Sequence, residues 1–544
     1  MSSEIKPVAK LRYLFPLIIS ATFAAGLWLG WFINKPAAMT EGEAKLQELF
    51  GIINREYVDS VDLDSLIERS LPSILSNLDP HSAYISLEQK NAGPDELEGY
   101  FSGVGITFQI YNDTVCVVEI VPGGPAQRVG MMAGDRIISV DGRVIASTGV
   151  TNDSVFKYLR GKDGTRVTLG VVRPGVKKRL TFKVTRGNIP VTTIDAAYML
   201  DATTGFVKVN KFGRSTYNEF LDALNKLSRK GAKDYVIDLR GNTGGYMEPA
   251  ILMVNEFLPE GKLIVQTHGR HIEQDQKVIS DGNGDFSQSR VIVLIDETSA
   301  SASEIFAGAI QDNDRGLLLG RRTFGKGLVQ RQILLNDSSE IRLTVQRYYT
   351  PSGRCIQKKY KPGQNEDYEY EIYERWQNGE MQTADSTKFD TSLMFKTGTG
   401  RTVYGGGGIM PDIFMPSDTT GVTGYFVKVF QDGLLQRYAY EYCDLNRSTL
   451  SKAKDLDGLL KLLPADDVLL GSFVYYAAQN GVPARWFYIN ISRELLINQL
   501  QALIARDILG IPAYYMVVGR RDPNVIKAVQ LMHTGRANFP IKNK

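Results

Sequence analysis

In the middle of the chain an amphipathic helix alternates with short runs of apolar residues. The pattern predicts a helix over 216–230, buried strands over 235–239, 291–295 and 317–319, and a further helix that begins near Ser301. Strands that alternate with helices in this way form a parallel or mixed sheet covered by helices. The chain is therefore expected to contain an α/β domain.

The length of 544 residues exceeds what one hydrophobic core supports and predicts three or four domains. The net charge of +3 carries no nucleic-acid signature, so no nucleic-acid partner is expected. The three cysteines form no CxxC pair, which argues against a disulfide framework. His268 and His271 are interpreted as part of a solvated loop between strands, so neither a metal site nor a cofactor is predicted.

The N-terminal segment carries the membrane signal of the sequence. Residues 13–33, about 21 in number, are almost wholly apolar, which is enough for a helix to span a hydrocarbon layer of roughly 30 Å. Basic residues within 1–12 predict a cytoplasmic tail. We therefore expect a single-pass transmembrane anchor in the inner (cytoplasmic) membrane, with the catalytic domain periplasmic. A cleaved signal peptide is the alternative, supported by small residues such as Ala24 and Ala25.

The next two segments differ in their hydrophobic period. Residues 34–95 have apolar side chains at helical spacing, whereas 96–187 contain short β runs divided by glycine-rich turns. The order of these runs resembles a PDZ domain, in which glycine N–H groups bind a carboxylate and an edge strand accepts a peptide. The alternative is another small β domain with glycine turns. The residues expected to bind substrate are Gly103, Val104, Gly105 and Ile106.

A first candidate catalytic segment, 296–305, contains Ser301 among small residues. A buried strand ends there and a helix begins, so the serine lies beside N–H groups that have no partner within the helix. Those donors and the helix dipole can stabilise an oxyanion formed at the serine. Taken alone, however, the segment favours a serine that caps the helix, with Glu304 in a capping box.

A second candidate segment places Lys326 between Gly325 and Gly327 after an apolar strand. Together with Gly320 it completes most of a phosphate-binding loop. However, Gly327 stands where that loop requires Ser or Thr as a magnesium ligand, and the residues that follow predict a strand instead of a helix. Nucleotide binding is therefore disfavoured.

A third segment, 238–245, is a strand followed by a glycine turn whose N–H groups can point at a ligand. Together the three segments resemble the carboxyl-terminal processing peptidases, the tail-specific Ser–Lys proteases, and the resemblance extends from 77 to 412 in the right order. It implies a ClpP/crotonase-like α/β peptidase core over 188–417 with an inserted β-rich PDZ domain. Helical N- and C-terminal regions complete the expected fold, the latter over 418–544.

The resemblance implies that Ser301 is the nucleophile, Lys326 the general base and Gln330 the residue that orients the lysine. A free lysine has a pKa near 10.4, so it needs burial to act as a neutral base at pH 7. Apolar neighbours such as Phe324 and Leu328 supply such surroundings. The expected reaction is attack by the serine on the scissile carbonyl to give an acyl-enzyme.

The resemblance also implies an oxyanion hole made of two backbone N–H groups. One comes from Ala302, and the other comes from Gly244 or Gly245, a choice that the sequence leaves open. The departures from the family pattern are Thr243, where many relatives have glycine, and a longer insertion over 358–405. Neither departure affects the proposed dyad.

The expected function is a serine-type endopeptidase that recognises the C-terminal tails of extracytoplasmic proteins through its PDZ domain. Its partners are then protein substrates with free C-termini, and a homo-oligomer or an adaptor stays open. The alternative is a catalytically silent, membrane-tethered PDZ scaffold, which need not retain Ser301, Lys326 and Gln330 at the family spacing.

Overall fold

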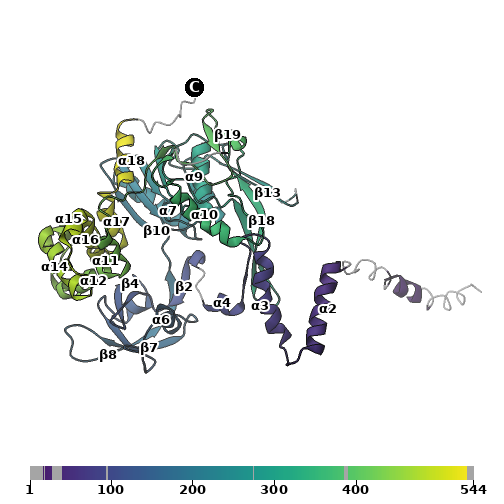
Figure 1. The fold of residues 1–544 in the computed structure, drawn as a ribbon, viewed down its shortest axis with the longest axis horizontal. Helices are drawn as coiled ribbons and strands as arrows, with labels where there is room; N and C mark the ends of the chain where they lie inside the picture. The colour runs from purple at the N-terminus through teal and green to yellow at the C-terminus, as the bar shows by residue number, and fades with distance from the viewer. Residues whose placement is uncertain are drawn as a thin grey trace, which may run out of the picture. The chain divides into compact units, whose positions relative to one another are not determined.

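The computed structural model describes residues 16, 19–26, 28, 39–92, 96–271, 273, 275–384 and 390–535. The chain divides into two compact units, Met1–Ile74 and Leu75–Lys544 (Figure 1). The first unit contains helix α2 (Glu41–Glu56) and most of helix α3 (Leu63–Ser76). At the start of α2 the Thr40 side chain accepts from a backbone N–H of the first turn, which is a standard helix cap.

The predicted membrane anchor needs correction. Among the residues that the structure describes, no helix is both long enough and apolar enough to cross a membrane. A span needs about 20 consecutive apolar residues, and of segment 13–33 the structure describes residues 16, 19–26 and 28, while the rest lies outside the described residues. The prediction of a single-pass inner-membrane protein with a periplasmic catalytic domain is wrong on this finding. The predicted tail over 1–12 also lies outside the described residues.

The second unit begins with strand β1 (Ala83–Ile85) and helix α4 (Leu87–Ala92) and continues into a β-rich domain. Its main sheet has the order β3-β4-β5-β7-β8, with β6 paired to β5. Helix α6 packs on this sheet through Val155 and Leu159, which join its apolar core. The elements are β3 (Ile106–Tyr111), β4 (Thr114–Ile120), α5 (Pro125–Arg128), β5 (Arg136–Val140), β6 (Arg143–Val144), α6 (Asn152–Leu159), β7 (Arg166–Val172) and β8 (Leu180–Thr185).

A two-stranded ribbon carries the chain into and out of this domain. Strand β2 (Tyr100–Gly103) pairs antiparallel with β9 (Gly187–Pro190), so that its first residue lies opposite the last residue of β9. Because entry and exit lie side by side, the β-rich domain is an insertion ahead of the α/β core. This confirms the inserted domain of the predicted fold.

The α/β core is built on a six-stranded sheet in the order β10-β11-β12-β15-β16-β21. The β10–β11 pair is antiparallel and the other neighbours are parallel. The elements are β10 (Ile194–Met199), β11 (Thr204–Val209), α7 (Thr216–Arg229), β12 (Asp234–Asp238), α8 (Met247–Asn255), β15 (Val291–Ile295), α9 (Ala302–Asp312), β16 (Leu317–Gly320) and β21 (Ile413–Phe414). The predicted α/β fold is confirmed, and each predicted core element is found within one or two residues of its expected range.

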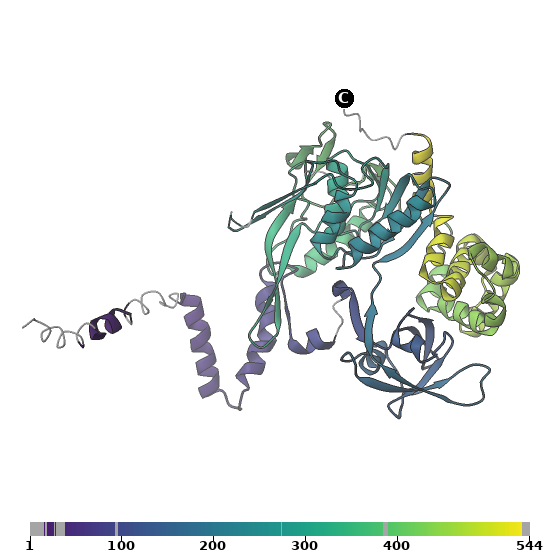
Figure 2. The ribbon, with the colours of Figure 1, turned by 180° about the vertical axis from the view of Figure 1, so that it is seen from behind.

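Alternate residues of the central strands point to opposite faces of the sheet, and both faces are covered. On one face Tyr235 and Ile237 pack with helices α7, α8 and α9. On the other face Val236 and Ile292 pack with the C-terminal helix α18 (Pro523–His533), drawn in yellow beside the sheet in Figure 2. Burial on both sides explains why these strands are apolar throughout.

A second, antiparallel sheet carries the strand that follows Lys326. Its order is β1-β18-β13-β14, and β17 also pairs with β18. His268, predicted in a loop, lies in β13, and its Nδ1 is 2.6 Å from Asp275 Oδ2. The elements are β13 (Leu263–Gly269), β14 (Gln276–Ile279), β17 (Leu328–Leu334) and β18 (Glu340–Tyr349), followed by α10 (Asn365–Gln377), β19 (Met394–Lys396) and β20 (Thr402–Tyr404).

The C-terminal region is helical, as predicted. Its first helices enclose an apolar core of their own that includes Leu435, Phe473 and Leu500. The last two helices contact the core sheet: α17 contacts β10, and α18 contacts β12 and β16. The helices before α18 are α11 (Gly424–Gln431), α12 (Leu434–Leu450), α13 (Leu456–Leu462), α14 (Asp466–Gln479), α15 (Trp486–Ile491), α16 (Arg493–Leu509) and α17 (Ile511–Gly519).

Candidate active site

A cavity of about 540 Å³ lies where the glycine turn after β12, the start of α9 and strands β17 and β18 meet. The residues predicted for catalysis and the oxyanion hole all line this cavity: Ser301, Lys326, Gln330, Gly244, Gly245 and Ala302. The predicted peptide-binding residues 103–106 lie in the inserted β domain instead. The structure therefore brings the predicted catalytic set together and leaves the peptide-binding loop outside this cavity.

Ser301 connects strand β15 to helix α9 in an unusual backbone conformation. Its φ is 55° and its ψ is −114°, which residues with a side chain rarely adopt. The fully buried strand before it and the fully buried helix after it hold this conformation in place. A sharp strand-to-helix corner of this kind is typical of an exposed nucleophilic serine.

The glycine turn packs directly against Ser301. Gly244 has a φ of 102°, and a Cβ at this position would lie 2.7 Å from Ser301 Cβ and 2.7 Å from the Ala300 carbonyl oxygen. The carbonyl of the fully buried Asn242 accepts from the Ala300 N–H at 3.1 Å and from the Ser303 hydroxyl at 2.9 Å. These contacts fix the turn and the serine relative to each other, and position 244 admits only glycine.

The structure distinguishes the two glycines that the sequence left open. The Gly244 N–H donates to the Asn242 side-chain oxygen at 2.8 Å. For the N–H groups of Gly245 and Ala302, no partner is found within the part of the chain that the structure describes. Both residues line the cavity, so their N–H groups are the donors available to an oxyanion.

Lys326 is held by a neutral partner inside the cavity. Its Nζ donates to Gln330 Oε1 at 3.1 Å. The other end of the Gln330 amide, Nε2, donates to the His81 carbonyl, so the orientation of the amide is determined. The lysine is thus fixed in direction by a side chain that carries no charge.

The surroundings of Lys326 favour its neutral form. Burial lowers the pKa of Lys326, and the Arg342 cation, which lines the same cavity, lowers it further. The carboxylates of Asp79 and Glu304 act in the opposite direction and do not outweigh these effects. A lowered pKa increases the fraction of lysine able to accept a proton.

Glu304 links the serine to the lysine through the backbone. One of its oxygens accepts from the N–H of Ser301 at 2.9 Å and from that of Lys326 at 2.8 Å. The other accepts from the Gly325 N–H at 2.8 Å and from the Thr323 hydroxyl. Burial raises the pKa of this enclosed carboxyl. The sequence pattern identifies Glu304 only as a helix cap, because its other donors lie about twenty residues further along.

The turn before β1 contributes the His81 carbonyl, a role that no sequence pattern indicated. Asp79 Oδ1 accepts from the N–H groups of His81 and Ser82, at 2.9 and 3.0 Å, and from the Thr344 hydroxyl of β18 at 3.0 Å. Burial, and next the nearby Lys326 cation, lower the pKa of His81 to about 4. The ring is therefore neutral at pH 7, and the contact of this turn with Gln330 is made by the backbone carbonyl of His81.

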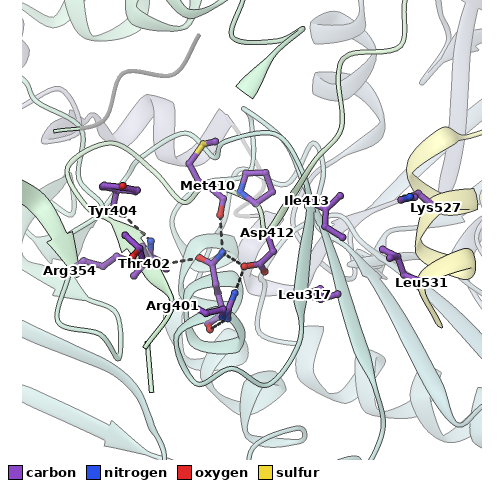
Figure 3. Close-up of a pocket in the computed structure, with 13 residues that line it drawn as sticks. Leu317, Arg354, Arg401, Thr402, Tyr404, Met410, Asp412, Ile413, Lys527 and Leu531 are labelled. Atoms are coloured by element: carbon purple, nitrogen blue, oxygen red, sulfur yellow. Dashed lines mark hydrogen bonds and ion pairs between the residues drawn. The ribbon is translucent and has the colours of Figure 1, made fainter. Parts of the chain in front are cut away.

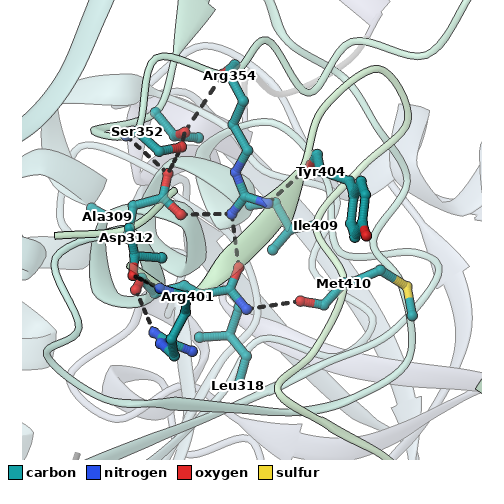
Figure 4. Close-up of polar contacts among 12 residues, drawn as sticks. Ala309, Asp312, Leu318, Ser352, Arg354, Arg401, Tyr404, Ile409 and Met410 are labelled. Atoms are coloured by element: carbon teal, nitrogen blue, oxygen red, sulfur yellow. Dashed lines mark hydrogen bonds and ion pairs between the residues drawn. The ribbon is translucent and has the colours of Figure 1, made fainter. Parts of the chain in front are cut away.

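A second cavity, of about 570 Å³, lies at the C-terminal end of α9 (Figure 3). Three of the charged residues that line it, Arg354, Arg401 and Asp412, form ion pairs. Arg354 Nη2 lies 2.7 Å from Asp312 Oδ1 (Figure 4), and Arg401 pairs with Asp314 at 2.7 Å and also with Asp412. None of the predicted catalytic residues lines this cavity.

In the inserted domain the predicted peptide-binding loop precedes an edge strand. Strand β3 ends the order of its sheet, and Phe108 on β3 contacts Phe156 on α6, with ring centroids 5.5 Å apart. Gly105 has a φ of 80°, and a Cβ there would lie 3.0 Å from Ile189 Cδ1. An edge strand beside an amphipathic helix is the arrangement that accepts a peptide as an added strand.

Comparison with protein-family models finds three matches along the chain. Residues 203–370 match peptidase family S41, and residues 116–173 match the PDZ domain. Residues 425–510 match a family of unknown function, DUF8443. The S41 match contains Ser301 and Lys326, and the PDZ match lies within the inserted β domain.

The chain is also similar to carboxy-terminal processing proteases of bacteria. It is 37% identical over 320 residues to the carboxy-terminal-processing protease of Bartonella bacilliformis, which covers 58% of this chain and 72% of that protein. It is 32% identical over 366 residues to the carboxy-terminal processing protease CtpA of Bacillus subtilis, which covers 64% and 76%. Among solved structures, a photosystem II D1 C-terminal processing protease is 28% identical, with 58% of this chain and 90% of that chain covered and a TM-score of 0.31.

Proposed function

Because the chain belongs to the carboxy-terminal processing proteases of peptidase family S41, and is therefore a serine protease, we propose that it cleaves proteins near their C-termini with Ser301 and Lys326. One observation carries the proposal: a half-buried lysine with a lowered pKa shares a cavity with a serine at a strand–helix corner. A lysine desolvated in this way can activate a serine without histidine.

The reaction begins with proton transfer. Neutral Lys326 accepts the proton of Ser301 while Oγ attacks the scissile carbonyl carbon, and the carbonyl oxygen becomes an oxyanion. The N–H groups of Gly245 and Ala302 donate to that oxyanion. Protonated Lys326 then gives its proton to the leaving amine, which leaves an ester on the serine. Water, deprotonated by the same lysine, attacks the ester carbonyl. The acyl group leaves as the new C-terminal acid while Lys326 gives its proton to Ser301 Oγ, which regenerates the enzyme.

Gln330 orients the side chain of Lys326 without stabilising its charged, ammonium form. A carboxylate at this position would favour the ammonium form of Lys326 and raise its pKa. The amide instead accepts one hydrogen bond from Nζ and donates one to the His81 carbonyl. The uncharged partner therefore supports a role for Lys326 as a base.

We propose that the inserted PDZ domain selects substrates with a free C-terminus. The residues Gly103 to Ile106 bind the terminal carboxylate, and the peptide pairs with the exposed edge of β3. The contact between Phe108 and Phe156 supports an apolar side chain at the end of the substrate, since one ring is on β3 and the other on α6.

The experiment measures cleavage of a protein that has an unstructured, apolar C-terminus. Ser301→Ala should abolish cleavage, and Ser451→Ala, at an exposed serine of the helical region, should leave it unchanged. Mass spectrometry of a reaction quenched early should find the acyl group on Ser301. Binding of the substrate without cleavage by the wild-type chain would favour a catalytically silent PDZ scaffold.

The same assay tests recognition of the tail. A substrate peptide with a C-terminal amide has no carboxylate for the loop at 103–106, so it should be cleaved more slowly, with the change mainly in KM. Equal values of kcat/KM for the acid and the amide would contradict tail recognition and leave the Ser–Lys mechanism unaffected.

A further inference from the structure

Arg240 is the first residue of the turn 240–245 that carries the Gly245 N–H. Its Nε and Nη2 donate to the Asp238 carboxylate at 3.0 and 2.7 Å. Its own N–H donates to the same carboxylate at 2.9 Å, and its carbonyl accepts from Lys208. The side chain and the peptide groups of Arg240 are therefore both fixed at the point where the turn begins.

The remaining guanidinium nitrogen reaches the C-terminal region of the chain. Arg240 Nη1 lies 2.8 Å from Oδ2 of Asp522. Asp522 is the N-cap of α18, and its Oδ1 accepts from the Asn524 N–H at 2.8 Å. One oxygen of this carboxylate thus caps the helix while the other holds the arginine.

Helix α18 is itself held on the core sheet, so Asp522 is presented by a rigid element. Its apolar side joins the cluster that covers the second face of the sheet. At its C-terminal end the Met532 carbonyl accepts from Arg290 Nη1 at 2.8 Å, and His533 Nε2 lies 3.0 Å from Asp201 Oδ2. The helix also contacts β12, the strand that ends at Asp238.

The charges around Arg240 balance only when Asp522 is included. Two cations, Arg240 and Lys208, face the single carboxylate of Asp238. Burial alone would raise the pKa of Asp238, but these two cations lower it to about 2. The side chains of Asp238 and Asp522 are only 3% and 14% exposed, so water screens their pairs weakly. Without Asp522, a net positive charge would remain enclosed beside the turn.

We propose that Asp522 is a positioning residue for proteolysis, which holds Arg240 and thereby the turn whose Gly245 N–H stabilises the oxyanion. The inference rests on the proposed function, because it concerns the transition state of that reaction. It assigns a role to the C-terminal region: α18 supports the oxyanion donor from the second face of the core sheet. Since the oxyanion exists only along the reaction, loss of this support lowers kcat and leaves substrate binding unchanged.

The test compares the full-length variants Asp522→Ser and Asp522→Asn with the wild-type chain. Serine and asparagine are both good N-caps, so α18 keeps its first turn while the charge is lost. We expect kcat to fall about tenfold, less than for direct removal of an oxyanion donor, with KM changed by less than about twofold. The control Asp457→Asn breaks the exposed Asp457–Arg520 pair of the same region and should change neither constant.

A peptide boronate provides a readout that a merely structural role would not move. Its adduct with Ser301 is tetrahedral and places an oxygen where the oxyanion forms, so its affinity should fall by the same factor as kcat. In the Ser301→Ala background, binding of the uncleaved substrate should be equal with and without Asp522→Ser.

Two kinds of failure are distinguishable. If the wild-type chain shows no cleavage that depends on Ser301, the proposed function is wrong and this inference falls with it. If the wild-type chain cleaves normally and both Asp522 variants keep its kcat, the positioning role alone is overturned. The positioning role is overturned as well if the Asp522 variants have a lower melting temperature but unchanged kcat and boronate affinity. That result would show that Asp522 only stabilises the fold.

Discussion

Helix α9 has a cavity at each end. The cavity beside Ser301 measures about 540 Å³, and the cavity beside Gln311 measures about 570 Å³. Basic side chains line both: Lys326 and Arg342 are among those at the first, and Arg354 and Arg401 among those at the second. Neither volume nor the presence of cations separates the two.

The two cavities differ in the partners of those cations. At the C-terminal end Arg354 pairs with Asp312 at 2.7 Å, so the charge of each is stabilised by the other. At the N-terminal end Lys326 Nζ donates to the uncharged Gln330, and no ion pair of Lys326 is found among the residues described. An enclosed lysine that forms no ion pair gives up its proton more readily than one that does, and a neutral lysine is a base. We therefore expect catalysis at the first end and a contribution to stability at the second.

The largest expected effect comes from removing the lysine. Lys326→Met keeps the apolar stem and removes the base, so kcat should fall about 10⁴-fold while the substrate still binds. Steady-state kinetics and a binding assay measure the two quantities. Cleavage at a tenth of the wild-type rate or more would show that Lys326 is not the base and would end the contrast between the two ends of α9.

The second prediction concerns the opposite end of the helix. Arg354 is 1% exposed, so Arg354→Met leaves Asp312 buried without its partner and should lower the free energy of unfolding by about 3–5 kcal/mol. Below its melting temperature the variant should retain kcat, because no group at the first cavity changes. Chemical denaturation and kinetics on one preparation check both parts. A large loss of kcat in the folded variant would contradict the assignment of a purely stabilising role.

The third prediction tests the link between serine and lysine. Glu304→Gln replaces one acceptor oxygen by an NH₂ group. In one orientation this donor faces the N–H groups of Ser301 and Lys326, and in the other it faces the Gly325 N–H and the Thr323 hydroxyl. An unsatisfied donor at this place should displace Ser301 relative to Lys326, so kcat should fall roughly 10- to 100-fold. The control Glu297→Gln alters a partly exposed carboxylate that pairs with Arg321 and should leave kcat unchanged. Equal kinetics for the two variants would remove Glu304 from the catalytic arrangement.

The smallest expected effect is a shift of the pH profile. Arg342 lowers the pKa of Lys326, so Arg342→Gln should raise that pKa and move the acid limb of kcat/KM to higher pH, with the alkaline plateau retained. The control Arg331→Gln, on an exposed arginine of the neighbouring strand, should leave the profile in place. A shift to lower pH would contradict the repulsion between the two cations.

The titration of Lys326 also makes the stability of the fold depend on pH. A lysine whose pKa is lowered in the folded state binds fewer protons there than in the unfolded chain, where its pKa is near 10.5. Between the two pKa values the free energy of unfolding therefore rises with pH. Lys326→Met should lack that part of the slope when denaturation is followed from neutral to alkaline pH.

Much of the core could be predicted from short stretches of sequence. Strand β15 occupies the predicted residues 291–295, and helix α9 begins one residue after Ser301. Both signals are local, because apolar runs and helix starts depend on neighbouring residues. The apolar segment 13–33 misled for the same reason: its composition suggested a span that the described helices do not support. The oxyanion donor was undecided because Gly244 and Gly245 look alike in sequence.

By itself, the sequence determined the order of the elements and the family. It also identified Ser301 and Lys326 as the pair to test, through the resemblance of three segments in the right order and not through either residue's neighbours alone. Only the tertiary structure decided which groups surround that pair. The Gln330 amide meets the His81 carbonyl 249 residues away, and Arg240 meets Asp522 from the last helix. A hydrogen bond or an ion pair is set by distance in space, and no local pattern records which distant carbonyl or carboxylate the folded chain brings within 3 Å.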